Sequence, residues 1–235
     1  MRVLITGANR GIGLEFVKQL LFRGEEVIAT CRKPEDAVQL HKLREQFEET
    51  LTICKLDTSS QNSINNAFDN IKQKITSLDL LINNAGISSG DNNRYHAFSN
   101  LYAEEISKAF HVNTIGPVLT IQKFFPLLKK AKNPKIANIS SKMGSISLKG
   151  GSSTYSYDAS KAALNMFSKS LAYYLKSERI LVLILHPGWV KTDMGTQRAS
   201  IKPELSVRGM IKVIDMASLS DTGKFFDWEG NEVPW

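Results

Sequence analysis

Short runs of branched apolar residues alternate with longer amphipathic segments along most of this chain. The short runs predict strands, and the longer segments predict helices because their apolar residues recur three or four positions apart. The predicted strands cover residues 3–5, 27–29, 51–56, 78–82, 136–139 and 180–185, with a short last strand at 225–226. The predicted helices cover residues 12–22, 34–47, 101–131 and 156–176, and one that starts after Ser59 or Ser60 and runs to Ile75.

Repeated strand–helix units predict an α/β fold with a parallel sheet. Right-handed crossovers then favour a doubly wound, mostly parallel sheet with helices on both faces, which is a Rossmann fold. We expect residues 1–235 to form a single domain, because no linker rich in Pro, Gly or Ser interrupts the alternation.

Composition excludes several other classes of protein. The chain has 235 residues, of which 42% are hydrophobic and 23% charged, so we expect a folded globular protein. Its formal charge of +7 favours anionic ligands. The most basic stretch, 129–135, lacks the aromatic residues and motifs of a nucleic-acid site, so no nucleic-acid partner is expected.

No apolar run approaches the roughly 18 residues that span a bilayer, so no membrane partner is expected. The apolar stretch at residues 3–5 is too short for the core of a signal peptide, which predicts a cytoplasmic protein. Cys31 and Cys54 lack the spacing of a metal site or redox motif, and no disulfide is expected between them. The four histidines also lack metal-ligand spacing, so we expect no metal.

A glycine-rich turn connects the first strand to the first helix. Gly7 permits the tight turn, Gly11 lets the backbone approach a pyrophosphate, and Gly13 lets the helix pack closely. The free N–H groups of the helix then face the anion. This pattern predicts a dinucleotide site that includes Gly7, Asn9, Arg10, Gly11, Ile12 and Gly13.

The end of the second strand indicates which dinucleotide binds. A site for NAD(H) places a carboxylate there for the ribose 2′-hydroxyl, but this chain has Arg32 and Lys33. A guanidinium offers paired donors to a phosphate, and Arg10 in the glycine turn can reach the same group. NADP(H) is therefore predicted over NAD(H), the alternative being that these cations are solvated surface residues.

Further motifs follow in order along the chain. They are Asn83-Asn84-Ala85-Gly86, Asn113, Ser141, Tyr157 with Lys161 four residues later, and Pro187-Gly188. With these motifs the chain resembles the short-chain dehydrogenase/reductase family. Its ending, with Thr192-Asp193-Met194, Thr222-Gly223-Lys224-Phe225 and Pro234-Trp235, is similar to that of C-factor and sniffer-type carbonyl reductases within the family.

The resemblance implies a catalytic set. Tyr157 would be the general acid when a carbonyl group is reduced, since a tyrosine pKa near 10 is lowered by a neighbouring ammonium, here that of Lys161. By resemblance, Lys161 also binds the nicotinamide ribose. Ser141 would hold the substrate oxygen, while Ser140 would face the other way. Asn113 would hold a kinked helix and a water that relays protons.

The resemblance also extends the cofactor site and implies how the chain is organised. The additional cofactor contacts are Asp57, Thr58, Asn83, Ala85, Gly86, Tyr157, Lys161, Pro187, Gly188, Val190 and Thr192. Residues 1–135 would form the cofactor half, and residues 136–235 the catalytic and substrate half. Residues 88–95 and the segment from Met194 to Ser206 would border an open substrate pocket. The long helices that carry Asn113 and Tyr157 imply a homodimer, with a tetramer as the alternative.

The function predicted from these residues is an NADP(H)-dependent carbonyl reductase acting on a small aldehyde or ketone. The main alternative is a nucleotide-binding regulatory or signalling protein of the C-factor type with little turnover. A sugar-nucleotide epimerase is disfavoured, because the C-terminal part leaves little room for a separate substrate domain. The sequence names neither the physiological substrate nor the direction of the reaction.

Overall fold

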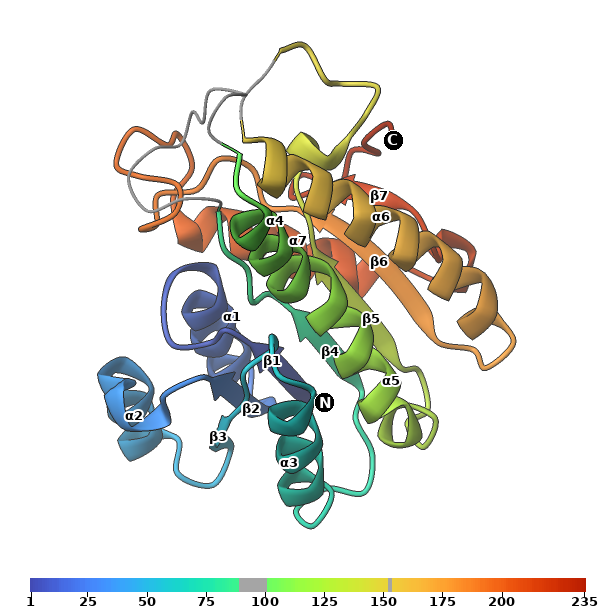
Figure 1. The fold of residues 1–235 in the computed structure, drawn as a ribbon. Coiled ribbons are helices and arrows are strands. Elements are labelled where there is room, and N and C mark those ends of the chain that lie inside the picture. The colour runs from blue at the N-terminus through green and yellow to red at the C-terminus, as the bar shows by residue number, and fades with distance from the viewer. Residues whose placement is uncertain (89–100, 152–153) are drawn as a thin grey trace.

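The computed structural model describes residues 1–88, 101–151 and 154–235. Their strands form one seven-stranded sheet in the order β3-β2-β1-β4-β5-β6-β7, and every neighbouring pair is parallel (Figure 1). The strands are β1 (Arg2–Thr6), β2 (Glu26–Cys31), β3 (Leu51–Lys55), β4 (Leu80–Asn83), β5 (Lys135–Ile139), β6 (Leu181–His186) and β7 (Phe225–Asp227). The predicted Rossmann-like, doubly wound fold is confirmed.

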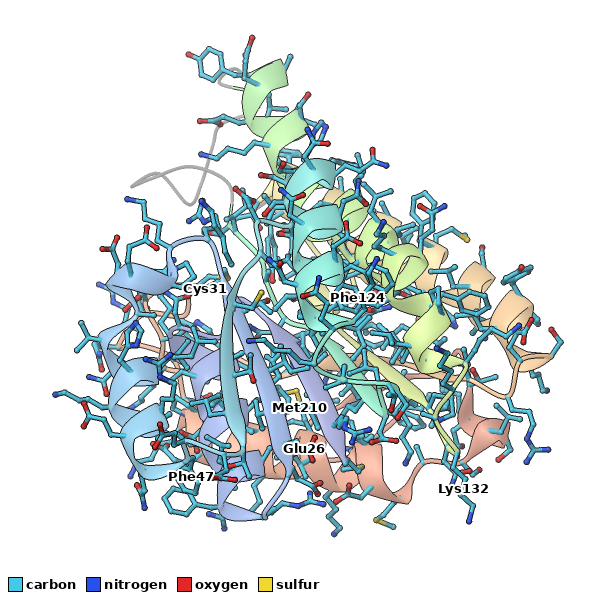
Figure 2. The ribbon with its side chains drawn as sticks, turned by 90° about the horizontal axis from the view of Figure 1, so that it is seen from below. Glu26, Cys31, Phe47, Phe124, Lys132 and Met210 are labelled. Carbon is cyan, nitrogen blue, oxygen red and sulfur yellow. The ribbon has the colours of Figure 1, made fainter. Side chains whose placement is uncertain are left out.

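Helices cover both faces of the sheet. One face packs against α1 (Gly11–Phe22) and α7 (Pro203–Met216), and the other against α3 (Gln61–Ile71), α5 (Gly116–Leu128) and α6 (Tyr155–Lys176). Met210 and Phe124 mark the two layers on opposite sides of the strands (Figure 2). Because helices cover both faces, β4, β5 and β6 are buried along almost their whole length, as is typical of parallel sheets.

The helices differ from the prediction at several points. The helix expected over 34–47 is a short 3-10 turn, Pro34–Asp36, followed by α2 (Val38–Gln46), because Ala37 between them has ψ 59°. The long helical region expected over 101–131 contains α4 (Ala103–Phe110), a π-helix (His111–Ile115) and α5. The helix α7 was not predicted, although its buried residues Val207, Met210, Ile211 and Ile214 have helical spacing.

The strand order places a site at one edge of the sheet. β1 pairs with β2 on one side and with β4 on the other. Successive strands are therefore added on one side of β1 as far as β3, and on its other side from β4 onward. Ligands of such open sheets bind at the carboxyl ends of the strands beside this change of side. Within the described ranges, no helix is long and apolar enough to cross a membrane.

Candidate active site

The glycine turn lies at the carboxyl end of β1. Gly7 has φ 64°, and a Cβ atom there would lie 2.8 Å from the Cα of Ala85, so only glycine fits this turn. A Cβ at Gly13 would lie 2.2 Å from the carbonyl oxygen of Gly7. The following helix begins at Gly11 and has no side-chain cap at Arg10, so its first N–H groups remain available for an anion.

Asn84 holds this turn in place. Its side-chain amide donates to the carbonyl oxygens of Thr6 and Gly7, each at 3.0 Å. The Thr6 hydroxyl accepts in return from the backbone N–H groups of Asn84 and Ala85, each at 3.1 Å. Asn84 was part of the Asn83–Gly86 motif but was not predicted as a site residue, because spacing does not show which amide reaches across to β1.

The neighbouring Asn83 has a different environment. Its side chain is buried and donates to Asn138 at 2.8 Å, and Asn138 donates to Ser168 of α6 at 2.8 Å. The predicted cofactor residue therefore directs its amide into a buried polar chain between the sheet and α6. The side-chain oxygen of Asn83 has no partner within the described part of the chain.

The three cations predicted to meet a 2′-phosphate differ in what they bind. Arg10 forms an ion pair with Asp193 at 2.9 Å, and Lys33 lies 3.7 Å from Asp36. Arg32 is exposed at the end of β2 and has no ion pair with any described residue. Arg32 is therefore the cation in this group that a phosphate can engage without displacing a carboxylate.

Asp57 and Thr58 follow β3 at the same edge. One carboxylate oxygen of Asp57 accepts from the backbone N–H and hydroxyl of Ser59, at 2.9 Å and 2.7 Å. Thr58 is buried against the start of α5, where a Cβ at Gly116 would lie 2.4 Å from the Thr58 carbonyl oxygen. This contact fixes the β3–α3 connection against the helix that follows Asn113.

Tyr157 and Lys161 lie on one face of α6 beside the end of β5. The Tyr157 side chain lies close to Ser141, which directly follows Ser140 after β5. The Ser140 hydroxyl instead donates to Asn165 at 2.5 Å, so the two serines point differently, as predicted. Lys161 is 4% exposed and donates to the carbonyl oxygen of Ile139 at 2.8 Å.

Burial shifts the pKa values of both residues. It raises the pKa of Tyr157 to about 12; the Ser141 hydrogen bond opposes this rise, and the charge of Asp158 adds to it. Burial lowers the pKa of Lys161 to about 8. The expectation that Lys161 depresses the Tyr157 pKa is not met in this structure, because the loss of solvent outweighs any stabilisation of the phenolate by the lysine.

Asn113 lies in the π-helix that separates α4 from α5. Its side chain accepts from the Ile87 N–H at 2.8 Å and donates to the Ile87 carbonyl at 2.9 Å. It also donates to the Ser160 hydroxyl at 3.0 Å, and that hydroxyl donates to the Tyr157 carbonyl at 2.7 Å. Ser160, which was not predicted, therefore connects Asn113 to the helix that carries Tyr157.

A Cβ at Gly86 would lie 3.3 Å from the side-chain oxygen of Asn113 and 3.7 Å from the Lys161 nitrogen. The motif after β4 thus contacts two members of the predicted catalytic set. The absence of a side chain at Gly86 leaves room for those groups.

The segment after β6 lies against the glycine turn. Gly188 has φ 81°, and a Cβ at Gly11 would lie 3.3 Å from the methyl group of Thr192. The Thr192 hydroxyl accepts from the Gly195 N–H at 3.0 Å, and the Pro187 carbonyl accepts from Ser206 of α7 at 2.6 Å. Pro187, Gly188 and Thr192 are thus brought to the same edge as the glycine turn, with the buried Val190 between them.

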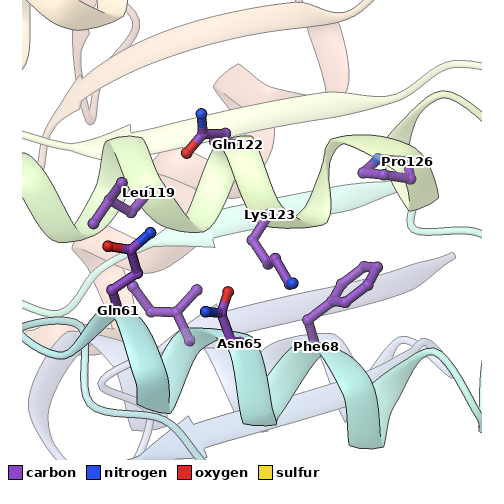
Figure 3. A pocket seen from close by; sticks show the side chains of 8 residues that line it. Gln61, Asn65, Phe68, Leu119, Gln122, Lys123 and Pro126 are labelled. Atoms are coloured by element: carbon purple, nitrogen blue, oxygen red, sulfur yellow. The ribbon is translucent and has the colours of Figure 1, made fainter.

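One recess in the surface lies away from this edge. A recess of about 350 Å³ lies between α3 and α5, with Asn65, Lys123 and Phe68 around it (Figure 3). None of the predicted site residues lines it.

Across the described ranges, no group of three His, Cys, Asp or Glu side chains is arranged to hold a metal ion. Of the predicted rim 88–95, residues 89–95 lie outside the described residues.

Comparison with known proteins places these features among the short chain dehydrogenases. The family model described as short chain dehydrogenase matches residues 1–202. The NADPH-bound carbonyl reductase from chicken fatty liver is 40% identical, with a TM-score of 0.92 over 100% of this chain and 98% of that one. The carbonyl reductase Sniffer of D. melanogaster is 31% identical, with a TM-score of 0.94 over 100% and 99% of the two chains. The C-signal protein of Myxococcus xanthus is 38% identical over 67% of this chain and 93% of its own length.

Proposed function

The chain belongs to the short-chain dehydrogenase family of oxidoreductases, and from that premise we propose that it reduces the carbonyl group of a small aldehyde or ketone with NADPH. The observation that carries this proposal is the placement of Tyr157 beside Ser141, with the Lys161 nitrogen 5.8 Å from the Tyr157 ring centroid on the same face of α6. A donor pair at the carboxyl edge of the sheet, beside a buried amine, suits the binding and protonation of a carbonyl oxygen.

The residues at the edge of the sheet fit a bound NADPH. Glycines leave the turn free of side chains at Gly7 and Gly13, and the start of α1 presents N–H groups to a pyrophosphate. Arg32 would hold the 2′-phosphate, and Arg10 and Lys33 would add charge beside it. Tyr157 and Lys161 would contact the nicotinamide ribose. The other proposed contacts are Asn9, Ile12, Asp57, Thr58, Asn83, Ala85, Gly86, Pro187, Gly188, Val190 and Thr192.

NADPH, when bound, supplies the hydride for the carbonyl carbon. The Ser141 hydroxyl donates a hydrogen bond to the carbonyl oxygen and orients it. Tyr157 then donates its proton to that oxygen, which completes the alcohol. A pKa of about 12 keeps Tyr157 protonated at neutral pH, so the donor form is present before the reaction. The Lys161 ammonium, when protonated, stabilises the phenolate that remains.

The test is NADPH oxidation with a panel of aldehydes, ketones and quinones, compared with NADH as the reductant. Tyr157→Phe removes the proton donor and should lower kcat at least about 100-fold. Tyr173→Phe is the matched control, because Tyr173 lies on the same helix with its side chain exposed. Equal activity in the two variants would contradict the proposed role of Tyr157.

The similarity to C-signal favours a second candidate, a nucleotide-binding signalling protein with little turnover. The same assay separates the two functions. NADPH binding without turnover across the panel would favour the signalling candidate over the reductase.

A further inference from the structure

His186 is the last residue of β6, and its imidazole lies beside the proposed site of reaction. The backbone N–H of Lys142 donates to Nδ1 of His186 at 3.3 Å. Lys142 directly follows Ser141 in the chain, and Pro187 directly follows His186. The other residues of β6 are buried, and the His186 side chain is half-buried at the carboxyl edge of the sheet. The hydrogen-bond partner of the ring, Lys142, and its chain neighbour, Pro187, therefore adjoin the residues assigned to the carbonyl and the nicotinamide.

The contact with Lys142 determines which ring nitrogen carries the proton. A backbone N–H can only donate, so Nδ1 is an acceptor and the proton of the neutral ring lies on Nε2. Burial lowers the pKa of His186 to about 4; the Lys142 charge adds to this effect and Asp227 opposes it. At neutral pH, His186 is therefore an uncharged ring with an N–H donor at Nε2.

That donor has no hydrogen-bond partner within the described residues. The nearby carboxylate of Asp227 is 5% exposed and is already engaged. It accepts from Lys142 at 3.3 Å, from the Asn231 N–H at 2.9 Å and from the Glu229 N–H at 3.1 Å. The Nδ1 contact anchors the loop after β5, but this anchoring role makes no use of Nε2.

We propose that the Nε2–H group of His186 binds a second hydrogen-bond acceptor on the substrate, next to the carbonyl group that is reduced. The preferred substrates are then carbonyl compounds with an additional uncharged oxygen acceptor close to the reacting carbonyl, such as a second carbonyl group. This inference rests on the proposed reductase function. It makes His186 a specificity-determining residue, because a partly desolvated donor favours a ligand that pairs with it.

Two amide substitutions separate the two ring nitrogens. His186→Gln places an amide N–H near the position of Nε2, whereas His186→Asn keeps an acceptor near Nδ1 for the Lys142 N–H and removes the donor at Nε2. The substrates are butane-2,3-dione and butan-2-one, which differ by one carbonyl group. The measured quantity is the ratio of kcat/KM for the dione to kcat/KM for the ketone, so differences in intrinsic reactivity cancel between variants.

We expect the ratio of His186→Gln to stay within about 2-fold of that of the unaltered protein. We expect His186→Asn to lower the ratio ~5- to 10-fold, because that factor corresponds to the usual net contribution of one hydrogen bond. The loss should occur in the dione reaction, with butan-2-one reduction and NADPH affinity unchanged. His186→Ala removes both ring contacts and should also lower the ratio, which keeps the test decisive if the Asn variant does not fold.

An unchanged ratio in His186→Asn, or in His186→Ala if the Asn variant does not fold, would overturn this inference. Continued reduction of butan-2-one by the same variant would leave the proposed function standing. A ratio that falls in His186→Gln but not in His186→Asn would assign His186 to the loop anchor alone. Absence of NADPH-dependent reduction of both compounds by the unaltered protein would overturn the inference together with the reductase proposal.

Discussion

The side-chain nitrogen of Lys161 lies 5.8 Å from the centroid of the Tyr157 ring. Its hydrogen bond goes to the Ile139 carbonyl at the end of β5, so the lysine is held beneath the tyrosine by the sheet. This arrangement keeps an amine buried next to the proposed proton donor. Burial of the amine has consequences for both catalysis and stability.

Reduction should depend on pH through Lys161. Burial lowers the pKa of this lysine to about 8, so its charge is present below that pH and lost above it. The charge favours the phenolate that Tyr157 becomes, and we therefore expect kcat for reduction to fall as pH rises through about 8. A pH–rate profile at saturating NADPH measures this. Any residual activity of Lys161→Arg should lack the decline, because a guanidinium stays protonated; a decline at the same pH in that variant would contradict the assignment.

Lys161→Met should abolish most of the activity but stabilise the fold. The lowered pKa means that the unfolded state binds more protons between pH 8 and 10.5, so the buried lysine destabilises the native state most below pH 8. After the lost hydrogen bond to Ile139 is subtracted, we expect a gain of about 1–2 kcal/mol in the free energy of unfolding at pH 7. Urea unfolding at pH 7 and pH 10 measures it, and the gain should shrink at pH 10. Lys176→Met, at an exposed position of the same helix, should show neither effect.

Ser160→Ala should slow the reaction with little effect on NADPH binding. The hydroxyl accepts from Asn113 and donates to the Tyr157 carbonyl, so its removal breaks one of the links between the π-helix and the start of the catalytic helix. We expect kcat to fall about 10-fold, as is common when a reacting group is displaced slightly. Ser170→Ala, at an exposed position of α6, is the control. A change in NADPH affinity with kcat intact would place Ser160 in the cofactor site instead.

Arg32→Ala should discriminate between the two nicotinamide cofactors. Arg32 has no ion pair with a described residue, whereas Lys33 lies 3.7 Å from Asp36. Loss of a charged contact to the 2′-phosphate should raise the Kd for NADPH about 10- to 100-fold and leave the Kd for NADH unchanged. Lys33→Ala should have a smaller effect. The two Kd values are measured by titration with NADPH and NADH, followed by cofactor fluorescence. An equal rise in both Kd values would count against a phosphate site at Arg32.

Two glycine substitutions test the phosphate turn. Gly13→Ala would place a Cβ atom 2.2 Å from the Gly7 carbonyl and 2.5 Å from the Asn84 amide nitrogen, so the turn must shift. We expect a loss of about 1–3 kcal/mol in stability and a marked loss of NADPH affinity. A Cβ atom at Gly24 would have no other atom within 4 Å, but the φ of 79° disfavours any residue with a side chain. Gly24→Ala should therefore lower the free energy of unfolding by about 1 kcal/mol without changing NADPH affinity. Thermal unfolding with and without NADPH distinguishes the two variants.

The amino-acid sequence by itself determined the local and periodic features of this protein. The alternation of strand and helix patterns and the glycines at 7, 11 and 13 predicted the fold, because backbone sterics and side-chain periodicity act within a few residues. The spacing of Tyr157 and Lys161 likewise placed both residues on one helix face. The roles of these residues, the single domain, the homodimer and the cytoplasmic location stay predictions.

Only the tertiary structure decided which groups face one another across the sheet. It directed Asn83 into the interior and Asn84 onto the glycine turn, although the two are adjacent in sequence. It paired Arg10 with Asp193, and it placed the Lys142 N–H on His186, 44 residues away. Hydrogen bonds and burial between distant segments leave no periodic pattern in the sequence, and the same burial decides the pKa values on which the proposed chemistry depends.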